Sequence, residues 1–336
     1  MSIFDNLTDK VKKAQPAIVL PDGPDPRILD AASRLSGSAI MKVILVGTEE
    51  EFAEGAKKGG YDISGCEIID PAKYAGMGGM IKTMVELRKG KITEAEAAEM
   101  LSHGNYFATM LVKMGKADCL LGGATYSTAD TVRPALQLVK TKPGAHLVSS
   151  TFIMIRESDG EKLAMADCAI NIDYQDTLDK EGNVTYTAAQ KLAEVAVETA
   201  KTAKVFEIDP KVAFLSFSTK GSGKGGTVKL SHDATIEAQK MAPDLPIDGE
   251  LQFDAAVSPT VAKTKCSDSK VAGQANVFIF PGIEAGNIGY KIAQRLGGFD
   301  AYGPILQGLN APINDLSRGC NADEVYKMAI ITAAFA

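Results

Sequence analysis

The chain has 336 residues, of which 45% are apolar and 23% charged, with no Trp and a formal net charge of -6. Such a composition is typical of a globular enzyme, and the negative charge gives no general attraction to nucleic acid or to anionic lipid. Because a single hydrophobic core stops growing at roughly 250 to 300 residues, we expect two domains. Any anionic ligand must then be bound by locally placed Arg and Lys side chains.

The five cysteines are widely spaced and form no C-x-x-C motif, so we expect reduced thiols in a cytoplasm. The three histidines are far apart and show no ligand spacing, and we therefore predict no metal site. Asp5 and Asp9 interrupt the stretch in which a signal peptide would be apolar. No segment approaches about 18 uninterrupted apolar residues, so no membrane span is expected.

Short apolar runs alternate with helical patterns along the whole chain. Ile3, Leu7 and Val11 have helical spacing and predict a short amphipathic helix over the first 13 residues. The expected strands are 17–20, 42–46, 118–121, 147–154, 212–217 and 277–281. The clearest helix is expected at 186–206, with Glu194 away from its apolar face, which consists of Leu192, Val195, Ala196, Thr199 and Ala203. This alternation predicts parallel α/β sheets, with ligands at the carboxyl ends of the strands.

Two glycine-containing turns indicate domain boundaries. Pro143-Gly144 separates a helical pattern from a strand, and Gly297-Gly298 has the character of a helix C-cap. We therefore expect the chain to leave its first domain, build a second and return. Residues 1–146 and 297–336 would form one discontinuous α/β domain, and 147–296 the other.

The segment FSTKGSGKGG (217–226) follows an apolar run and has some features of a phosphate-binding loop. Ser218 occupies the place of the first Gly of a Walker motif, and Gly225 occupies that of the Ser/Thr which would hold Mg²⁺. An ATPase is therefore disfavoured. A glycine-rich turn can still form an anion-binding nest of N–H groups, so ligand contact by this loop stays open.

The segment LLGGATYSTADTVRPALQLV (120–139) reads as a strand, a turn and a helix. Pro134 belongs in the first turn of a helix, which places the helix start at Asp130 or Thr131. Ser127, Thr128 and Arg133 would then surround a helix N-terminus, which favours an anion. The alternative is a plain N-cap with a surface arginine.

A second candidate is the C-terminal segment with Ser317, Arg318 and Gly319 in a turn before a helix that starts near Asn321. Asn321 and Glu324 could simply form a capping box. Alternatively, a hydroxyl, a guanidinium and a carboxylate lie within about one turn, enough for positioning, charge stabilisation and proton abstraction. Periodicity does not choose between these interpretations.

Three further features receive weaker interpretations. Arg88 lies in a local basic patch, which is usually a solvated helix end. Asp25 and Pro26 suit the N-cap and first position of a helix. Cys168 follows an apolar run, and such cysteines are commonly buried and inert, so a nucleophilic role is disfavoured.

Several of these motifs occur in the order seen in one family. They are PDGPDPRIL, STADTVRPAL, MADCAIN, LSFSTKGS, GNIGYKIAQRLGGFDAYGPILQGL and NDLSRGC. The chain resembles the short-form phosphate acetyltransferases (phosphotransacetylases) over essentially all of its length. The resemblance implies a fold similar to that of isocitrate and isopropylmalate dehydrogenases, with two α/β domains, a cleft between them, and a homodimer.

The reaction implied by the resemblance is reversible transfer of an acetyl group between acetyl phosphate and coenzyme A (CoA). CoA would be a substrate, and no permanently bound cofactor is implied. Ser317 and Arg318 would lie at the reacting centre and bind acetyl phosphate together with Ser127 and Thr128. Arg88 and Arg133 match family arginines that bind CoA phosphates.

A carboxylate seven residues after Ser317 would act as base on the CoA thiol. The family commonly has Asp there, whereas this chain reads Asp323-Glu324, so either residue could be the base. Because a thiol with a pKa of about 8.5 is mostly protonated at neutral pH, such a base would raise the thiolate fraction. Direct attack of the thiolate needs no enzyme nucleophile.

Three alternatives stay open at this point. A butyryl or other short-chain acyltransferase would share the catalytic motif and differ in pocket volume. A non-catalytic acetyl-CoA-sensing domain is disfavoured by the intact Ser-Arg-Gly motif. An NAD-dependent dehydrogenase is weaker still, because no strand leads into a G-x-G-x-x-G motif.

Overall fold

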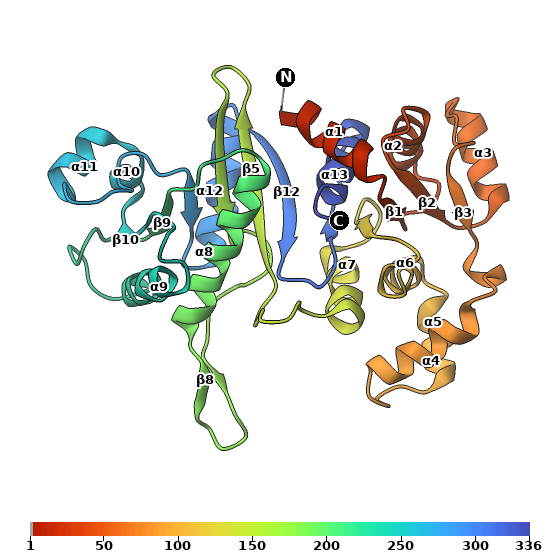
Figure 1. Ribbon diagram of the computed structural model, residues 1–336, viewed down its shortest axis with the longest axis horizontal. Helices are drawn as coiled ribbons and strands as arrows, with labels where there is room; N and C mark the ends of the chain where they lie inside the picture. Colours follow the sequence, from red (N-terminus) through yellow and green to blue (C-terminus); the bar gives the residue numbers. More distant parts are fainter. Residues whose placement is uncertain (1–2) are drawn as a thin grey trace. The chain divides into compact units, whose positions relative to one another are not determined.

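The computed structural model describes residues 3–336 and divides into two compact units (Figure 1). The first unit is the chain up to Gly144 together with Leu309–Ala336, and the second is Ala145–Gly308. The chain thus leaves the first unit once and returns to it. The chain re-enters the first unit at Leu309, later than residue 297, where the glycine pair predicted the boundary. The reason is that β12 (Asp300–Gln307) still belongs to the second unit, in which it pairs antiparallel with β5 (Ser149–Arg156).

The first unit is built on a five-stranded sheet in the order β13-β4-β1-β2-β3, in which every pairing is parallel. The strands are β1 (Ala17–Leu20), β2 (Lys42–Val46), β3 (Glu67–Ile69), β4 (Cys119–Gly122) and β13 (Ile313–Asp315). The apolar runs predicted β1 and β2 with their observed bounds and β4 within one residue. The pattern did not reveal β3 or β13, because three residues are too few for a periodicity.

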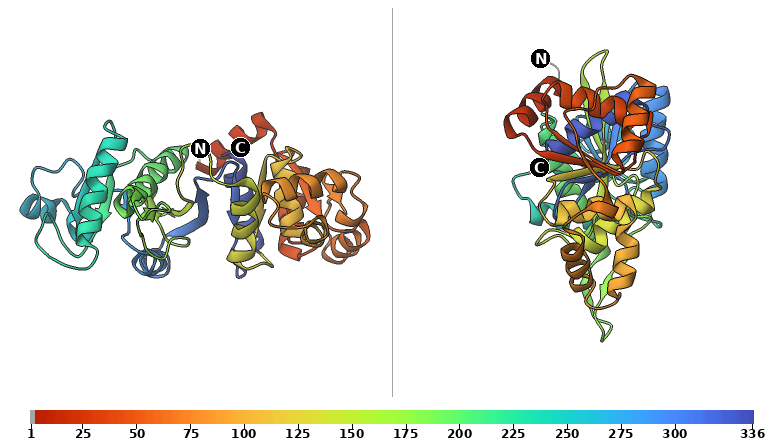
Figure 2. Two further views of the ribbon diagram at one scale, coloured as in Figure 1. Left: turned by 90° about the horizontal axis from the view of Figure 1, so that it is seen from below. Right: turned by 90° about the vertical axis from the view of Figure 1, so that its right-hand side faces the viewer.

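Helices cover both faces of this sheet. They are α1 (Ile3–Ala14), α2 (Pro26–Gly37), α3 (Glu49–Gly59), α4 (Met77–Leu87), α5 (Glu94–Leu101), α6 (Gly104–Lys113), α7 (Thr128–Pro134) and α13 (Ala322–Ala333), with short turns η1 (Pro71–Lys73) and η2 (Ala135–Val139). Alternate strand residues such as Val19 and Leu120 pack against Phe107 of α6, and α2 and α13 contact each other and the sheet. α1 contacts α13, so segments near the two ends of the chain lie side by side (Figure 2).

Helix α7 begins earlier than predicted, with Ser127 rather than Asp130 or Thr131 as its N-cap. Pro134 therefore lies inside the helix, where it has no N–H to donate to the carbonyl of Asp130. Asn105 replaces that donor, since its Nδ2 lies 2.7 Å from the Asp130 carbonyl oxygen. The chain continues as the wider π-turn η2 directly after the proline. A tertiary hydrogen bond thus permits the proline position that the local rule excluded.

The second unit has a six-stranded sheet in the order β10-β9-β11-β6-β5-β12. Besides β5 and β12, its strands are β6 (Glu161–Ala166), β9 (Val212–Leu215), β10 (Ile247–Leu251) and β11 (Val277–Ile279), and a separate hairpin joins β7 (Thr177–Leu178) to β8 (Val184–Tyr186). This sheet is mixed rather than parallel, because β5 runs antiparallel to both of its neighbours. A short turn connects β5 to β6, and so short a connection joins only antiparallel strands.

The helices of the second unit are α8 (Ala188–Val205), α9 (Val228–Met241), α10 (Phe253–Val257), α11 (Pro259–Lys265) and α12 (Ile283–Leu296). The predicted apolar face of α8 is buried. Glu194 is also buried, contrary to expectation, because its carboxylate accepts hydrogen bonds from the Tyr186 hydroxyl and the His146 backbone N–H, both at 2.9 Å. None of the described helices combines the length and apolar character that crossing a membrane requires.

Candidate active site

Three strand ends meet at one edge of the first sheet, because β1, β4 and β13 are parallel neighbours. The Leu316 N–H donates a 2.7 Å hydrogen bond to the Gly122 carbonyl oxygen and holds the loop after β13 against the end of β4. Ligands of parallel α/β sheets bind at such an edge. The structure therefore brings together the two polar segments that the sequence singled out, 120–139 and the turn after β13.

The Ser317-Arg318-Gly319 turn lies exposed between β13 and α13. The Cys320 N–H donates to the Ser317 carbonyl oxygen at 2.9 Å, and the Gly319 N–H donates to Ser317 Oγ at 3.2 Å. Because Ser317 Oγ accepts from the backbone, its own hydrogen stays available to a ligand. The Arg318 guanidinium is likewise exposed, so both side chains can reach a bound substrate.

Arg27 holds this turn in place, a role that the sequence analysis missed. Its Nη1 donates to the carbonyl oxygens of Arg318, at 2.8 Å, and Cys320, at 3.0 Å, while its Nη2 donates to Ala124 at 2.9 Å. An ion pair with Asp25 (2.9 Å) fixes the guanidinium itself. Arg27 therefore clamps the loops after β4 and β13 to the start of α2. Only its place two residues after the correctly predicted N-cap Asp25 could have drawn attention to it.

Two of the hydroxyls predicted to bind phosphate, those of Ser127 and Thr128, lie at the start of α7 and already donate to carboxylates of the chain. Ser127 Oγ donates to Asp130 Oδ2 at 2.6 Å as part of a capping box, and Thr128 Oγ1 donates to Asp315 Oδ2 at 2.7 Å. The Ser127 hydrogen bonds hold the pKa of Asp130 below its ordinary value. An incoming anion would thus compete with Asp130 and Asp315 for these hydrogens.

Three guanidinium groups of the first unit act in pairs on nearby titratable groups. Burial raises the pKa of Tyr106, and the positive charges of Arg133 and Arg88 oppose that rise. The charges of Arg133 and Arg318 both act on Asp130. Arg133 therefore shares one neighbour with Arg88 and another with Arg318, although the three arginines lie far apart in the sequence. Arg88 Nε is buried and has no hydrogen-bond partner among residues 3–336.

The two acidic residues of α13 have different surroundings. Asp323 forms ion pairs of 3.1 Å with both Arg34 and Lys327. Partial burial alone would raise the pKa of Asp323, but these two cations hold it below its ordinary value. Glu324 Oε2 accepts the Asn321 N–H at 2.9 Å, which completes the predicted capping box. Glu324 has no cationic partner among the ion pairs found in the described chain.

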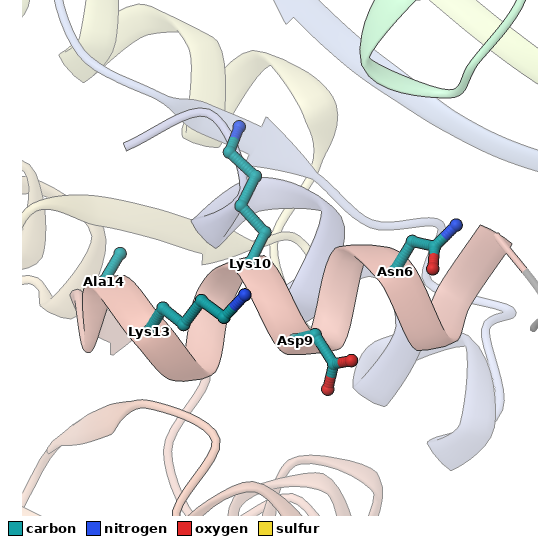
Figure 3. A pocket seen from close by; sticks show the side chains of 5 residues that line it. All are labelled: Asn6, Asp9, Lys10, Lys13 and Ala14. Carbon is teal, nitrogen blue, oxygen red and sulfur yellow. The ribbon is translucent and has the colours of Figure 1, made fainter.

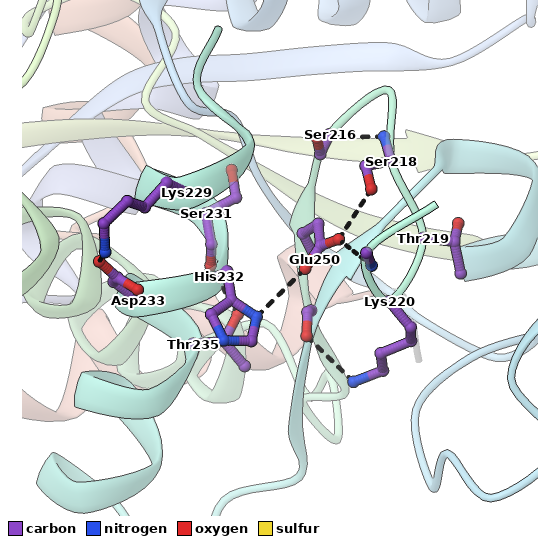
Figure 4. A network of polar contacts seen from close by, with 12 residues as sticks. Ser216, Ser218, Thr219, Lys220, Lys229, Ser231, His232, Asp233, Thr235 and Glu250 are labelled. Carbon is purple, nitrogen blue, oxygen red and sulfur yellow. Dashed lines mark hydrogen bonds and ion pairs between the residues drawn. The ribbon is translucent and has the colours of Figure 1, made fainter. Parts of the chain in front are cut away.

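The glycine-rich loop 217–226 is organised around Glu250, a carboxylate of its own unit (Figure 4). Glu250 Oε1 accepts from Ser218 Oγ at 2.8 Å and from the Gly221 N–H at 2.7 Å. The Gly223 N–H in turn donates to Ser218 Oγ at 2.9 Å, and Lys220 pairs with Asp248. The chain itself therefore satisfies the Gly221 and Gly223 amides, two of those that a phosphate nest in this loop would use.

Two other features contribute no chemistry to the site. Cys168 is buried, and burial raises the pKa of its thiol well above the ordinary value, so it is a poor nucleophile. A surface hollow along α1 is lined by Asn6, Asp9, Lys10, Lys13 and Ala14 (Figure 3). Lys10 Nζ donates to the Ala334 carbonyl oxygen at 2.7 Å and ties α1 to the end of α13.

A parallel sheet whose strand ends carry exposed hydroxyl, guanidinium and carboxylate groups is typical of an α/β enzyme that acts on anionic substrates. Comparison with known proteins names the class. The family described as phosphate acetyl/butaryl transferase matches residues 2–333. The phosphate acetyltransferase of Bacillus subtilis (strain 168) is 52% identical over 332 residues, which cover 99% of this chain and 98% of the relative.

Solved structures agree. A phosphotransacetylase from Streptococcus pyogenes has a TM-score of 0.92 and 53% sequence identity, with 99% of this chain and 97% of that one covered. A 4-hydroxythreonine-4-phosphate dehydrogenase from Burkholderia phymatum, 12% identical with a TM-score of 0.50, covers 95% of this chain and 96% of its own, and it shows the fold alone. The expected dehydrogenase-like α/β fold is thereby confirmed.

The chain belongs to the phosphate acetyl/butaryl transferase family. It is an acyltransferase of the phosphate acetyltransferase type, which transfers an acetyl group reversibly between acetyl-CoA and phosphate. The family assignment made from the motifs is confirmed.

Proposed function

We propose that acetyl transfer proceeds by direct attack of the CoA thiolate on acetyl phosphate in a ternary complex at the strand ends of the first unit. The observation that carries this proposal is the juxtaposition of the exposed Ser317-Arg318 turn with the hydroxyls and arginine of α7. These groups converge although about 190 residues separate them, a distance that only the parallel pairing of β4 with β13 overcomes. Hydroxyls and guanidiniums suit phosphoryl oxygens because both donate hydrogen bonds, the hydroxyl with a rotatable hydrogen and the guanidinium with a planar fork.

Each step of the transfer has a residue of this chain to support it. Glu324 accepts the thiol proton, the sulfur forms a bond to the acetyl carbon, and the bond from that carbon to the phosphate oxygen breaks. Arg318 stabilises the negative charge on the carbonyl and phosphate oxygens, while Ser317 orients the phosphate. Ser127 and Thr128 bind the phosphoryl group, and Arg88 and Arg133 bind the phosphates of CoA.

We assign the base to Glu324 rather than Asp323. Arg34 and Lys327 hold Asp323 ionised but also engage both of its oxygens, which leaves it a weak base. Glu324 occupies the position seven after Ser317 and uses only Oε2 in its cap. Glu324 thus keeps a carboxylate oxygen for the thiol proton.

The substrate range is tested by measuring thioester formation from CoA with acetyl, propionyl and butyryl phosphate in parallel. We expect acetyl phosphate to have the highest kcat/KM, with each added methylene costing about tenfold or more, since a pocket discriminates by about 1 to 3 kcal/mol per methylene. Butyryl phosphate as the best substrate would instead identify a butyryltransferase. Binding of acetyl-CoA without any turnover would contradict the enzyme mechanism and indicate a sensing domain.

We infer further that the enzyme is cytoplasmic, carries no resident cofactor and is a homodimer. All five cysteines have free thiols, which suits a reducing compartment. Support for the dimer comes from an apolar stripe on α12, where Ile288, Ile292 and Leu296 are 58%, 54% and 85% exposed. Their spacing of four residues places them on one helix face. A monomer rarely exposes such a stripe to water, and a second copy of the chain would cover it.

Replacing Ile292 by Glu is expected to convert the dimer to a monomer, because the interface would have to bury an unpaired charge. Light scattering coupled to size-exclusion chromatography measures the mass directly. Ile236→Glu on α9 is the matched control, since Ile236 is also exposed, at 40%, on a helix of the same unit. Equal masses for both variants and the wild type would contradict an interface at the α12 stripe.

A further inference from the structure

Two buried carboxylates flank the glycine pair at the end of β4. Asp22, after β1, is 6% exposed, and Asp315, the last residue of β13, is 1% exposed. A Cβ at Gly123 would lie 2.3 Å from Asp315 Oδ1, and a Cβ at Gly122 would lie 3.6 Å from Asp22 Oδ2. The glycines thus let both carboxylates approach the backbone of β4 from its two neighbouring strands.

Few donors compensate these two charges. Asp22 Oδ1 accepts from the N–H and the hydroxyl of Thr125, at 2.6 and 2.8 Å, and Asp315 Oδ2 accepts from Thr128 Oγ1 at 2.7 Å. Asp22 Oδ2 and Asp315 Oδ1 have no hydrogen-bond partner among the described residues. Two ionised carboxylates so buried and so poorly compensated are unfavourable, and a proton taken up by the pair relieves the cost.

The groups around Asp315 support such protonation. Burial raises the pKa of Asp315 to about 6 against the opposing effect of the Thr128 and Thr131 hydroxyls, and the negative charge of Asp22 adds to the rise. Burial also raises the pKa of Asp22, although hydrogen bonds from Thr125 and the Gly123 backbone oppose the rise. The hydroxyl of Thr131 faces Asp315 from α7, and the Leu316 N–H lies beside it. The titratable and charged groups farther out are Asp25, Arg27, Tyr126 and Cys320 around Asp22, and Asp130, Arg133 and Arg318 around the start of α7.

We propose that Asp315 is a positioning residue whose protonation sets the direction of the Thr128 hydroxyl hydrogen and thereby the affinity for the phosphoryl group of acetyl phosphate. The proposal rests on the proposed function, in which Thr128 contacts that group. An ionised Asp315 can only accept, so Thr128 must donate to it and can offer a phosphate nothing but lone pairs. A protonated Asp315 donates to Thr128 Oγ1, and the Thr128 hydrogen is then free to bind a phosphoryl oxygen.

The test is the KM for acetyl phosphate from about pH 5 to pH 8 in wild type, Asp315→Asn, Thr128→Val and Thr128→Ser. Asn mimics protonated Asp, because its amide donates to Thr128 at every pH. The ratio of the wild-type KM to that of Asp315→Asn should rise roughly tenfold with pH, with a midpoint near 6. A change of about tenfold is the effect expected from the loss of one hydrogen bond to a charged group. Ionisation of the substrate is common to all variants and cancels in the ratio.

Thr128→Ser should keep the wild-type pH profile, whereas Thr128→Val should have a raised KM whose ratio to that of Asp315→Asn is constant. The KM for CoA should show no such pH-dependent ratio.

A constant ratio of the wild-type KM for acetyl phosphate to that of Asp315→Asn, or an equal change in the KM for CoA, overturns the proposal. If Asp315→Asn does not fold, the ratio of the wild-type KM to that of Thr128→Val decides in the same way: it rises with pH if the proposal holds and is constant if it fails. A wild type that turns over acetyl phosphate with a constant ratio overturns this inference alone, whereas an inactive wild type overturns the proposed function as well.

Discussion

Replacing Arg318 by Ala is expected to lower kcat for acetyl-CoA formation by about 10²- to 10³-fold, the usual cost of removing a group that stabilises transition-state charge. The guanidinium is exposed and uses no hydrogen bond of its own to hold the turn, which depends instead on Arg27 and the backbone. The fold should therefore survive. Initial rates with saturating CoA and acetyl phosphate, together with thermal unfolding, measure both effects.

Two variants control for the loss of a positive charge. Arg318→Lys keeps the charge but not the planar fork, and should recover only part of the rate. Lys180→Ala removes one exposed positive charge from the hairpin between β7 and β8 of the second unit, and should leave kcat unchanged. A kcat for Arg318→Ala within about threefold of wild type would contradict the proposed charge stabilisation.

Replacing Glu324 by Gln is expected to lower kcat by about 10²- to 10⁴-fold, because Gln cannot accept the thiol proton. Gln at the third helical position still completes a capping box, so the stability of α13 should change little. This substitution therefore separates the chemical role of Glu324 from its role as a cap. The rate deficit should also shrink as pH approaches the thiol pKa of about 8.5, where CoA ionises without help.

Asp323→Asn is the matched comparison on the neighbouring residue. It removes the exposed ion pairs of Asp323 with Arg34 and Lys327. Each exposed ion pair of this kind contributes at most about 1 kcal/mol to the stability of the fold. We expect its kcat to stay within a few fold of wild type. A larger loss in Asp323→Asn than in Glu324→Gln would transfer the base to Asp323.

Local signals predicted much of this molecule because they depend on neighbouring residues alone. An apolar run of four or five residues gave β1 and β2, and capping chemistry placed Asp25 and Asn321 at helix starts. Helical spacing identified the buried faces of α1 and α8. Each of these features is satisfied by contacts within a few residues or by burial of a continuous stripe.

Other predictions failed where a distant residue altered the local balance. Asn105 bonds to the carbonyl that Pro134 leaves without a donor, and α7 therefore starts three residues before the predicted Thr131 and two before Asp130. Tyr186 and His146 stabilise the buried carboxylate of Glu194, which was expected to lie away from the apolar face of α8. No pattern in a single segment contains such partners.

The sequence by itself determined the alternating α/β organisation, the chain's departure from its first unit and return to it, and the motifs that indicate a phosphate acetyltransferase. Only the tertiary structure decided the surroundings of the candidate groups. Parallel pairing of β1, β4 and β13 brought Arg27 into contact with the Arg318 turn and Thr128 into contact with Asp315. In the glycine-rich loop, the Glu250 carboxylate accepts the Gly221 N–H. The reason is physical: a side chain's identity sets which bonds it can form, whereas burial and long-range partners determine which bonds it does form and where its proton resides.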